Sequence, residues 1–262
     1  MPPATAHAGR RVEARAADGP PALMRRLREH TAAVHAATEA LPLMHRLLSA
    51  YPSGEDYRCY LHALHGVYAA LEPALYAAVP QRLRSELGIA PKLPALLQDL
   101  QALHVADPHP AGAAAIGSMP KPDRCARVHP LLKAAEPRRT ASALGGLYVL
   151  EGSTLGGQLI ARRLKHNRRA SSGSGPDGPS PTPPALPTAF LEFRNRHAAG
   201  DWRRFGSVLS AWAAARPGTE QAMLDGALGT FESVHAALAD AGTAAGPGAG
   251  PGRASTDASA LP

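Results

Sequence analysis

The sequence predicts an all-α protein whose helices form a single domain. Two segments, residues 22–166 and 189–240, are rich in Ala and Leu, and their apolar residues recur at helical spacing. None of their runs alternates between polar and apolar residues with the period of a strand. We therefore expect the 262-residue chain to fold as helices around one core.

Three segments lack the apolar periodicity that a packed core needs. Residues 1–21 are rich in Ala, Pro and Arg, residues 169–188 are dense in Ser, Gly and Pro, and residues 241–262 are of low complexity. We expect disordered tails at both ends and a disordered insertion at 169–188, within a helical domain that spans 22–240.

The first helix is expected from Pro21 to about Ser49. The stripe that indicates it consists of Leu23, Leu27, Thr31, Val34, Thr38 and Leu41. His35 lies on this stripe, four residues after Thr31, so its imidazole is expected to point at the core.

The later helices are indicated by caps, spacing and breaks. Ser53 followed by Asp56 three residues later is an N-cap pattern, so a second helix begins there. Further helices are expected at 94–104, 139–165, 189–212 with a break near Gly200, and 219–239, and a turn is expected at MPKPDR.

Composition narrows the class of protein. No stretch approaches the roughly 20 apolar residues that span a bilayer, and no signal peptide is present, so we expect a cytoplasmic protein. The only cysteines, Cys59 and Cys125, form no CxxC pair and are expected to be free thiols. The net charge of +7 favours an anionic ligand or an acidic partner protein. With only 5% aromatic residues, a nucleic-acid partner is not expected.

The helical stretch LGGLYVLEGSTLGGQ, residues 144–158, contains five glycines. Each glycine inside a helix costs roughly 0.5–1 kcal/mol relative to alanine. Gly145, Gly152 and Gly156 fall on one side of the helix, and the adjacent stripe holds Gly146, Ser153 and Gly157. This flank admits either a closely packed helix or a planar ligand. A phosphate loop is disfavoured, because no GxxxxGK[ST] pattern is present.

A histidine on a facing helix would complete a site for a planar ligand. An imidazole on one side and a glycine-lined, bent helix on the other are the features of a haem pocket. In such a pocket His35 would be the single axial ligand of the haem iron, with a small space left for dioxygen.

Two motifs resemble the haem oxygenase family. LREHTAAVHAATEA, which contains Arg28, Thr31, His35 and Glu39, resembles the proximal-helix signature. LYVLEGSTLGGQ resembles the distal helix of the bacterial, bacteriophytochrome-associated branch. The resemblance covers about residues 22–165 and, more loosely, 189–239. It implies an all-α, single-domain haem-oxygenase-like fold, with haem sandwiched between a proximal helix and a kinked distal helix.

The resemblance implies a role for individual residues. His35 would bind the iron, and Glu39 would fix the neutral tautomer of its imidazole. Gly152 and Gly156 would flank the distal oxygen site, with Gly157 beside them.

Other residues would deliver protons and bind the haem propionates. Animal-type enzymes have an aspartate where this chain has Ser153. A serine hydroxyl does not ionise, so proton delivery would use ordered waters and another proton donor. We expect Tyr148 to be that donor. The propionates need cations. Arg28 is the first candidate, and Arg203 and Arg204 could add a second contact.

The implied reaction uses haem b as both substrate and cofactor. Dioxygen and external electrons would cleave it to biliverdin, ferrous iron and CO. A ferredoxin or flavodoxin-type donor, or ascorbate, would supply the electrons, and an acidic redox protein would dock on the basic rim. A bacteriophytochrome could accept the biliverdin.

Two alternatives stay open at this level. A non-catalytic haem carrier or sensor would use His35 equally well. A di-iron carboxylate bundle is suggested by the ExxH pair Glu232 and His235, but it needs a second ExxH, which the sequence lacks. For His62 and His65 we expect one packed and one exposed side chain.

Overall fold

The computed structural model describes residues 21–106, 122–171, 174–175, 178–179, 185–194 and 197–244. Its helices are α1 (Ala22–Glu39), α2 (Pro42–Leu47), α3 (Gly54–Ala78), α4 (Gln81–Leu87), α5 (Leu93–Ala106), the 3-10 helix η1 (Pro122–Cys125), α7 (Val128–Leu131), α8 (Arg138–Ser171), α9 (Ala198–Ala214) and α10 (Glu220–Ala244). Two-residue strands, β1 (Ser174–Gly175) and β2 (Gly178–Pro179), pair antiparallel. The all-α prediction is confirmed.

The segments predicted to be disordered fall largely outside the described residues. Residues 1–20 and 245–262 belong to this group, as do 172–173, 176–177 and 180–184 within the predicted insertion. Helix α10 continues to Ala244, beyond the predicted end of the domain at 240, and α8 extends to Ser171, into the predicted insertion. Within the described ranges, no helix is both long and apolar enough to cross a membrane.

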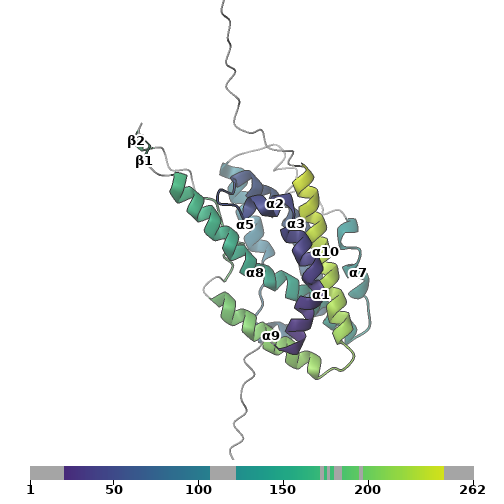
Figure 1. The fold of residues 1–262 in the computed structure, drawn as a ribbon. Coiled ribbons are helices and arrows are strands. Elements are labelled where there is room, and N and C mark those ends of the chain that lie inside the picture. The colour runs from purple at the N-terminus through teal and green to yellow at the C-terminus, as the bar shows by residue number, and fades with distance from the viewer. Residues whose placement is uncertain are drawn as a thin grey trace, which may run out of the picture.

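The core is organised by the crossing of α8 and α10, which Figure 1 shows at the centre of the molecule. A Cβ on Gly145 would overlap the carbonyl oxygen of Met223, and a Cβ on Gly226 would overlap that of Ser142. The two helix backbones therefore touch directly, which glycine alone permits. Gly146, next to this crossing, similarly has no room for a side chain beside Leu75 of α3.

Helix α1 lies along α10, and α9 packs against α8 near the first turns of α1 (Figure 1). Leu23, Leu27 and Thr31 are buried, as the apolar stripe predicts. The Thr38 hydroxyl lies 3.2 Å from Nδ1 of His235, which joins the end of α1 to α10.

The single helix predicted from Pro21 to Ser49 is wrong, because the structure divides it into α1 and α2. Leu41 is extended, with φ −62° and ψ 140°. A residue before proline is pushed out of the α region, and Pro42 then opens the next helix at its first position. By contrast, Ser53 caps α3 as predicted, since its hydroxyl accepts a hydrogen bond from the Asp56 amide at 2.9 Å.

The helix predicted from residue 189 begins only at Ala198, and Gly200 lies inside it. The buried Asp99 carboxylate of α5 accepts hydrogen bonds from the amides of Ala189 and Phe190, both at 2.9 Å. Arg194 then adopts a left-handed conformation with φ 54°. These constraints hold residues 189–194 as turns, so the helix starts later.

The helix crossing predicts a large effect of one methyl group. We expect Gly145→Ala to lower the free energy of unfolding by roughly 1–3 kcal/mol, because the two backbones must separate. Urea denaturation measures this change. The control is Gly200→Ala, whose added Cβ meets nothing within 4 Å. That variant should be unchanged or more stable by up to about 1 kcal/mol, and equal stability of the two variants would contradict the close crossing.

Candidate functional site

The candidate site begins where α1 and α8 meet, at Thr31 and Tyr148. The Tyr148 hydroxyl lies close enough to Thr31 for the two side chains to interact, and the buried Thr31 hydroxyl donates to the Leu27 carbonyl at 2.8 Å. Burial raises the pKa of Tyr148, although Thr31 and the charge of Arg28 oppose this. Tyr148 therefore stays protonated at neutral pH. His35 lies one turn beyond this contact on α1, and Gly152 lies one turn beyond it on α8.

The expectation that His35 points into the core is wrong. Its side chain is 57% exposed, and its ring lies 5.4 Å from that of Phe231 on α10. Its Nδ1 is 3.5 Å from a carboxylate oxygen of Glu39. The helical stripe is buried up to Thr31 and again at Thr38, but between them α1 presents His35 at the surface. More than half of the imidazole side chain is therefore open to solvent.

The second half of α8 presents an open, apolar face. A Cβ on Gly156 would meet nothing within 4 Å. Leu155 and Leu159 flank it with 41% and 43% of their surface exposed. Exposed apolar side chains beside a bare backbone form a surface on which a flat, apolar group can lie.

The five glycines of α8 therefore serve different purposes. Gly145 and Gly146 allow close helix packing, the first of the interpretations that the sequence left open. Gly157 is buried against the backbone of Leu191. Gly152 lies under the indole of Trp202, whose nearest atom would be 3.3 Å from an added Cβ, and only Gly156 is open.

Ser153 is turned toward α3, where it meets a residue that the sequence analysis missed. Its hydroxyl donates to the Leu150 carbonyl at 2.7 Å and lies 2.9 Å from the Tyr68 hydroxyl, which consequently donates to it. Burial raises the pKa of Tyr68, so this donor stays protonated. The sequence offered no signal for Tyr68 beyond its place on an apolar stripe.

The three predicted arginines lie in different settings. Arg28 is exposed on α1, close enough for its charge to act on Tyr148. Arg203 is exposed on α9. Arg204 donates to the carbonyls of Glu86 and Ser85, both at 2.8 Å, and these bonds hold its guanidinium against the end of α4.

The structure separates the groups that a di-iron site would need. Glu232 pairs with Arg127, and His235 is bonded to Thr38. Among the residues that the structure describes, no three His, Cys, Asp or Glu side chains gather as a metal site. Of His62 and His65, one was expected to be packed and one exposed. His65 is buried, but His62 is half-buried and not exposed.

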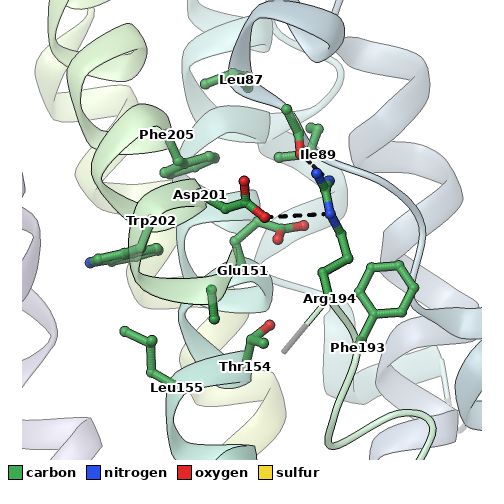
Figure 2. Close-up of a pocket in the computed structure, with 12 residues that line it drawn as sticks. Leu87, Ile89, Glu151, Thr154, Leu155, Phe193, Arg194, Asp201, Trp202 and Phe205 are labelled. Carbon is green, nitrogen blue, oxygen red and sulfur yellow. Dashed lines mark hydrogen bonds and ion pairs between the residues drawn. The ribbon is translucent and has the colours of Figure 1, made fainter. Parts of the chain in front are cut away.

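A small pocket lies between α8, α9 and the end of α4. Figure 2 shows Glu151, Thr154 and Leu155 of α8 facing residues of α9 across it. Arg194 pairs with Asp201 at 3.4 Å along one side. The pocket has a volume of about 30 Å³, which suits water-sized occupants and not a tetrapyrrole.

Comparison with known families identifies the family to which this chain belongs. The family model described as Heme oxygenase matches residues 21–240. The chain belongs to the haem oxygenase family. A comparison with curated proteins gives no match. Membership supports haem binding and haem degradation by an oxidoreductase.

Two solved haem oxygenases share the fold. Heme oxygenase-1 of the cyanobacterium Synechocystis sp. PCC6803, solved in complex with heme, is 19% identical, with a TM-score of 0.57, over 83% of this chain and 91% of that one. The heme oxygenase of Leptospira interrogans is 17% identical, with a TM-score of 0.57, over 83% of this chain and 98% of that one. At these identities the likeness shows the fold.

The residues around the α1–α8 contact suit a haem of the kind this family binds. The exposed His35 imidazole is a group of the kind that binds haem iron, and the face formed by Leu155, Gly156 and Leu159 suits the flat porphyrin. The exposed Arg28 offers a cation for a propionate.

Replacing Gly156 should lower the affinity for haem without lowering the stability of the fold. We expect Gly156→Leu to unfold at the same or a higher urea concentration, because the site is open and leucine favours a helix. Haem affinity, measured by absorbance titration with haemin, should fall at least about tenfold, because the side chain projects into the porphyrin surface. Gly200→Leu on α9 is the matched control and should bind haemin normally. Normal affinity of Gly156→Leu would remove this face from the site.

Proposed function

We propose that this chain is a haem oxygenase that cleaves haem b to biliverdin, ferrous iron and CO, with dioxygen and external electrons. Haem is then both substrate and cofactor. Family membership supports haem degradation. The observation that carries the proposal is the accessible His35 imidazole, paired with Glu39, on the helix that meets the glycine-bearing α8.

Glu39 sets the tautomer of His35 in this proposal. A carboxylate 3.5 Å from Nδ1 favours a proton on that nitrogen and leaves the Nε2 lone pair for iron. A neutral imidazole is the ligand that suits dioxygen chemistry at haem, whereas a thiolate favours cleavage of the O–O bond. The imidazole that α1 presents at this turn is therefore the kind of iron ligand that the proposed reaction needs.

The bare backbone of α8 supplies selectivity by shape. With no side chain at Gly156, and with the indole of Trp202 covering Gly152, the porphyrin can approach one part of the helix more closely than another. Packing against α8 then decides which edge of the porphyrin lies nearest the helix. We explain cleavage at a single position of the porphyrin in this way.

Proton delivery uses hydroxyl groups and water. Tyr68 donates to Ser153, and Ser153 donates to the Leu150 carbonyl, beside the turn that carries Gly152. Tyr148, which lies beside Thr31, is a second donor. None of these groups ionises at neutral pH. The Tyr148 hydroxyl would orient water and pass on a proton without becoming charged, while Tyr68 and Ser153, whose protons go to Ser153 and to the Leu150 carbonyl, would hold the turn in place.

Cations at the edge of the site complete the proposal. Arg28, and less directly Arg203, would bind the propionates, while Arg204 is bonded to α4. The surrounding positive charge would dock an acidic redox protein, such as a ferredoxin or flavodoxin-type donor, for which ascorbate can substitute. A biliverdin-binding protein such as a bacteriophytochrome would take the product.

An aerobic assay tests the proposed reaction. The purified chain is incubated with haemin and either ascorbate or a ferredoxin system while the absorbance spectrum is recorded. We expect loss of the Soret band and growth of a biliverdin band at long wavelength. A haem spectrum that stays unchanged would contradict the oxygenase and support a haem carrier or sensor.

A matched pair of histidine variants tests the iron ligand. We expect His35→Ala to abolish turnover and to weaken haemin binding, because the nitrogen donor to iron is lost. His30→Ala, an exposed histidine on the same helix, is the control and should retain turnover. Normal turnover by His35→Ala would show that the ligand has been misassigned.

A further inference from the structure

Lys92 is a buried lysine between α4 and α5 that the proposed chemistry does not use. The residue is 2% exposed. Glu72 of α3 fixes its backbone, because one carboxylate oxygen accepts the Lys92 amide at 2.8 Å and the other accepts the Leu93 amide at 2.9 Å. The start of the lysine side chain is thus held firmly against α3.

The ammonium group of Lys92 reaches one turn of α8. Its Nζ donates to the Leu150 carbonyl at 2.5 Å and to the Thr154 hydroxyl at 2.6 Å. It also lies 3.4 Å from a carboxylate oxygen of Glu151. These three acceptors lie on either side of Gly152, in the turn of α8 that precedes the proposed haem face of Leu155, Gly156 and Leu159.

Two glycines weaken the backbone of this part of α8. Glycine at positions 152 and 156 removes the side chains that would stiffen and pack the helix. Beyond it, Leu155 and Leu159 are exposed. The Leu150 carbonyl, meanwhile, is the meeting point of Lys92, Ser153 and the Tyr68 hydroxyl, which approaches it at 3.4 Å.

A lysine is a costly residue for this position. Burial lowers the pKa of Lys92 and raises that of Glu151, and each of the two charges opposes the shift of the other. An apolar side chain of similar length would avoid this desolvation, but it could not donate to a carbonyl or a hydroxyl. The gain from the charged group is directional bonding to α8.

We propose that Lys92 is a positioning residue, which clamps the Leu150–Thr154 turn of α8 and so sets the position of the haem face that follows it, at Leu155, Gly156 and Leu159. The consequence for catalysis rests on the proposed function, but the clamp itself does not. It can be measured in the chain without haem.

Hydrogen exchange of the full chain tests the clamp. In Lys92→Met, amides 150–156 should exchange at least about tenfold faster than in the wild type, while α10 keeps its protection. Lys165→Met is the matched control, because Lys165 is an exposed lysine of α8 that pairs with Glu192 at 2.6 Å. It should leave amides 150–156 unchanged.

A double variant keeps the test decisive if Lys92→Met fails to fold. Lys92→Met with Glu151→Gln removes both buried charges and should show the same local loss of protection. Unchanged exchange at 150–156, or equally faster exchange in every helix, would overturn the proposal.

The catalytic consequence is read separately from the clamp. In Lys92→Met, haemin affinity should stay within about threefold of the wild type, while turnover falls at least about tenfold. If the wild type has no turnover, the proposed function fails and the exchange result still stands. If turnover is normal in the variant, the positioning role fails.

Discussion

The direct backbone contact between α8 and α10 is the constraint on which the rest of the molecule depends. Gly145 and Gly226 let the two helices approach more closely than any side chain would allow. This contact fixes the first half of α8, and α1, which also lies along α10, meets α8 at Thr31 and Tyr148. The second half of α8 leaves α10 (Figure 1), so His35 and Gly156 both lie at accessible surfaces beyond a common point of contact. The proposed site is thus a product of how α8 crosses the core.

The same helix is anchored from within by polar groups. Ser153 and Lys92 donate to the Leu150 carbonyl, and Tyr68 donates to Ser153. Buried hydrogen-bond networks of this kind specify one geometry, because each member is costly to leave unpaired. The helix therefore combines a bare outer face with a firmly bonded inner face. That division explains how a glycine-rich helix can present its backbone to a ligand and still hold its shape.

Much of the fold and part of the site follow from sequence pattern, and the limits have physical causes. Apolar periodicity finds the helical segments and the Ser53 cap finds the start of α3, because both signals are local. The pattern missed the break at Leu41 and the turns before Ala198. The pattern did not separate Gly145 from Gly156, because their neighbours come from distant segments, Met223 for the first and none for the second. It placed His35 in the core, since a helical stripe does not show how much of the helix face a neighbouring helix covers, and His35 lies at the exposed edge of the contact between α1 and Phe231 of α10. Lys92, a single lysine between two prolines, carries no motif, and only the folded chain brings it to α8.

The most direct test of this account is a crystal structure of the chain with haemin bound. The account predicts iron bonded to Nε2 of His35, the Glu39 carboxylate beside Nδ1, and the porphyrin lying on α8 at Gly156. Iron bonded to any other residue, or a porphyrin seated away from α8, would contradict it.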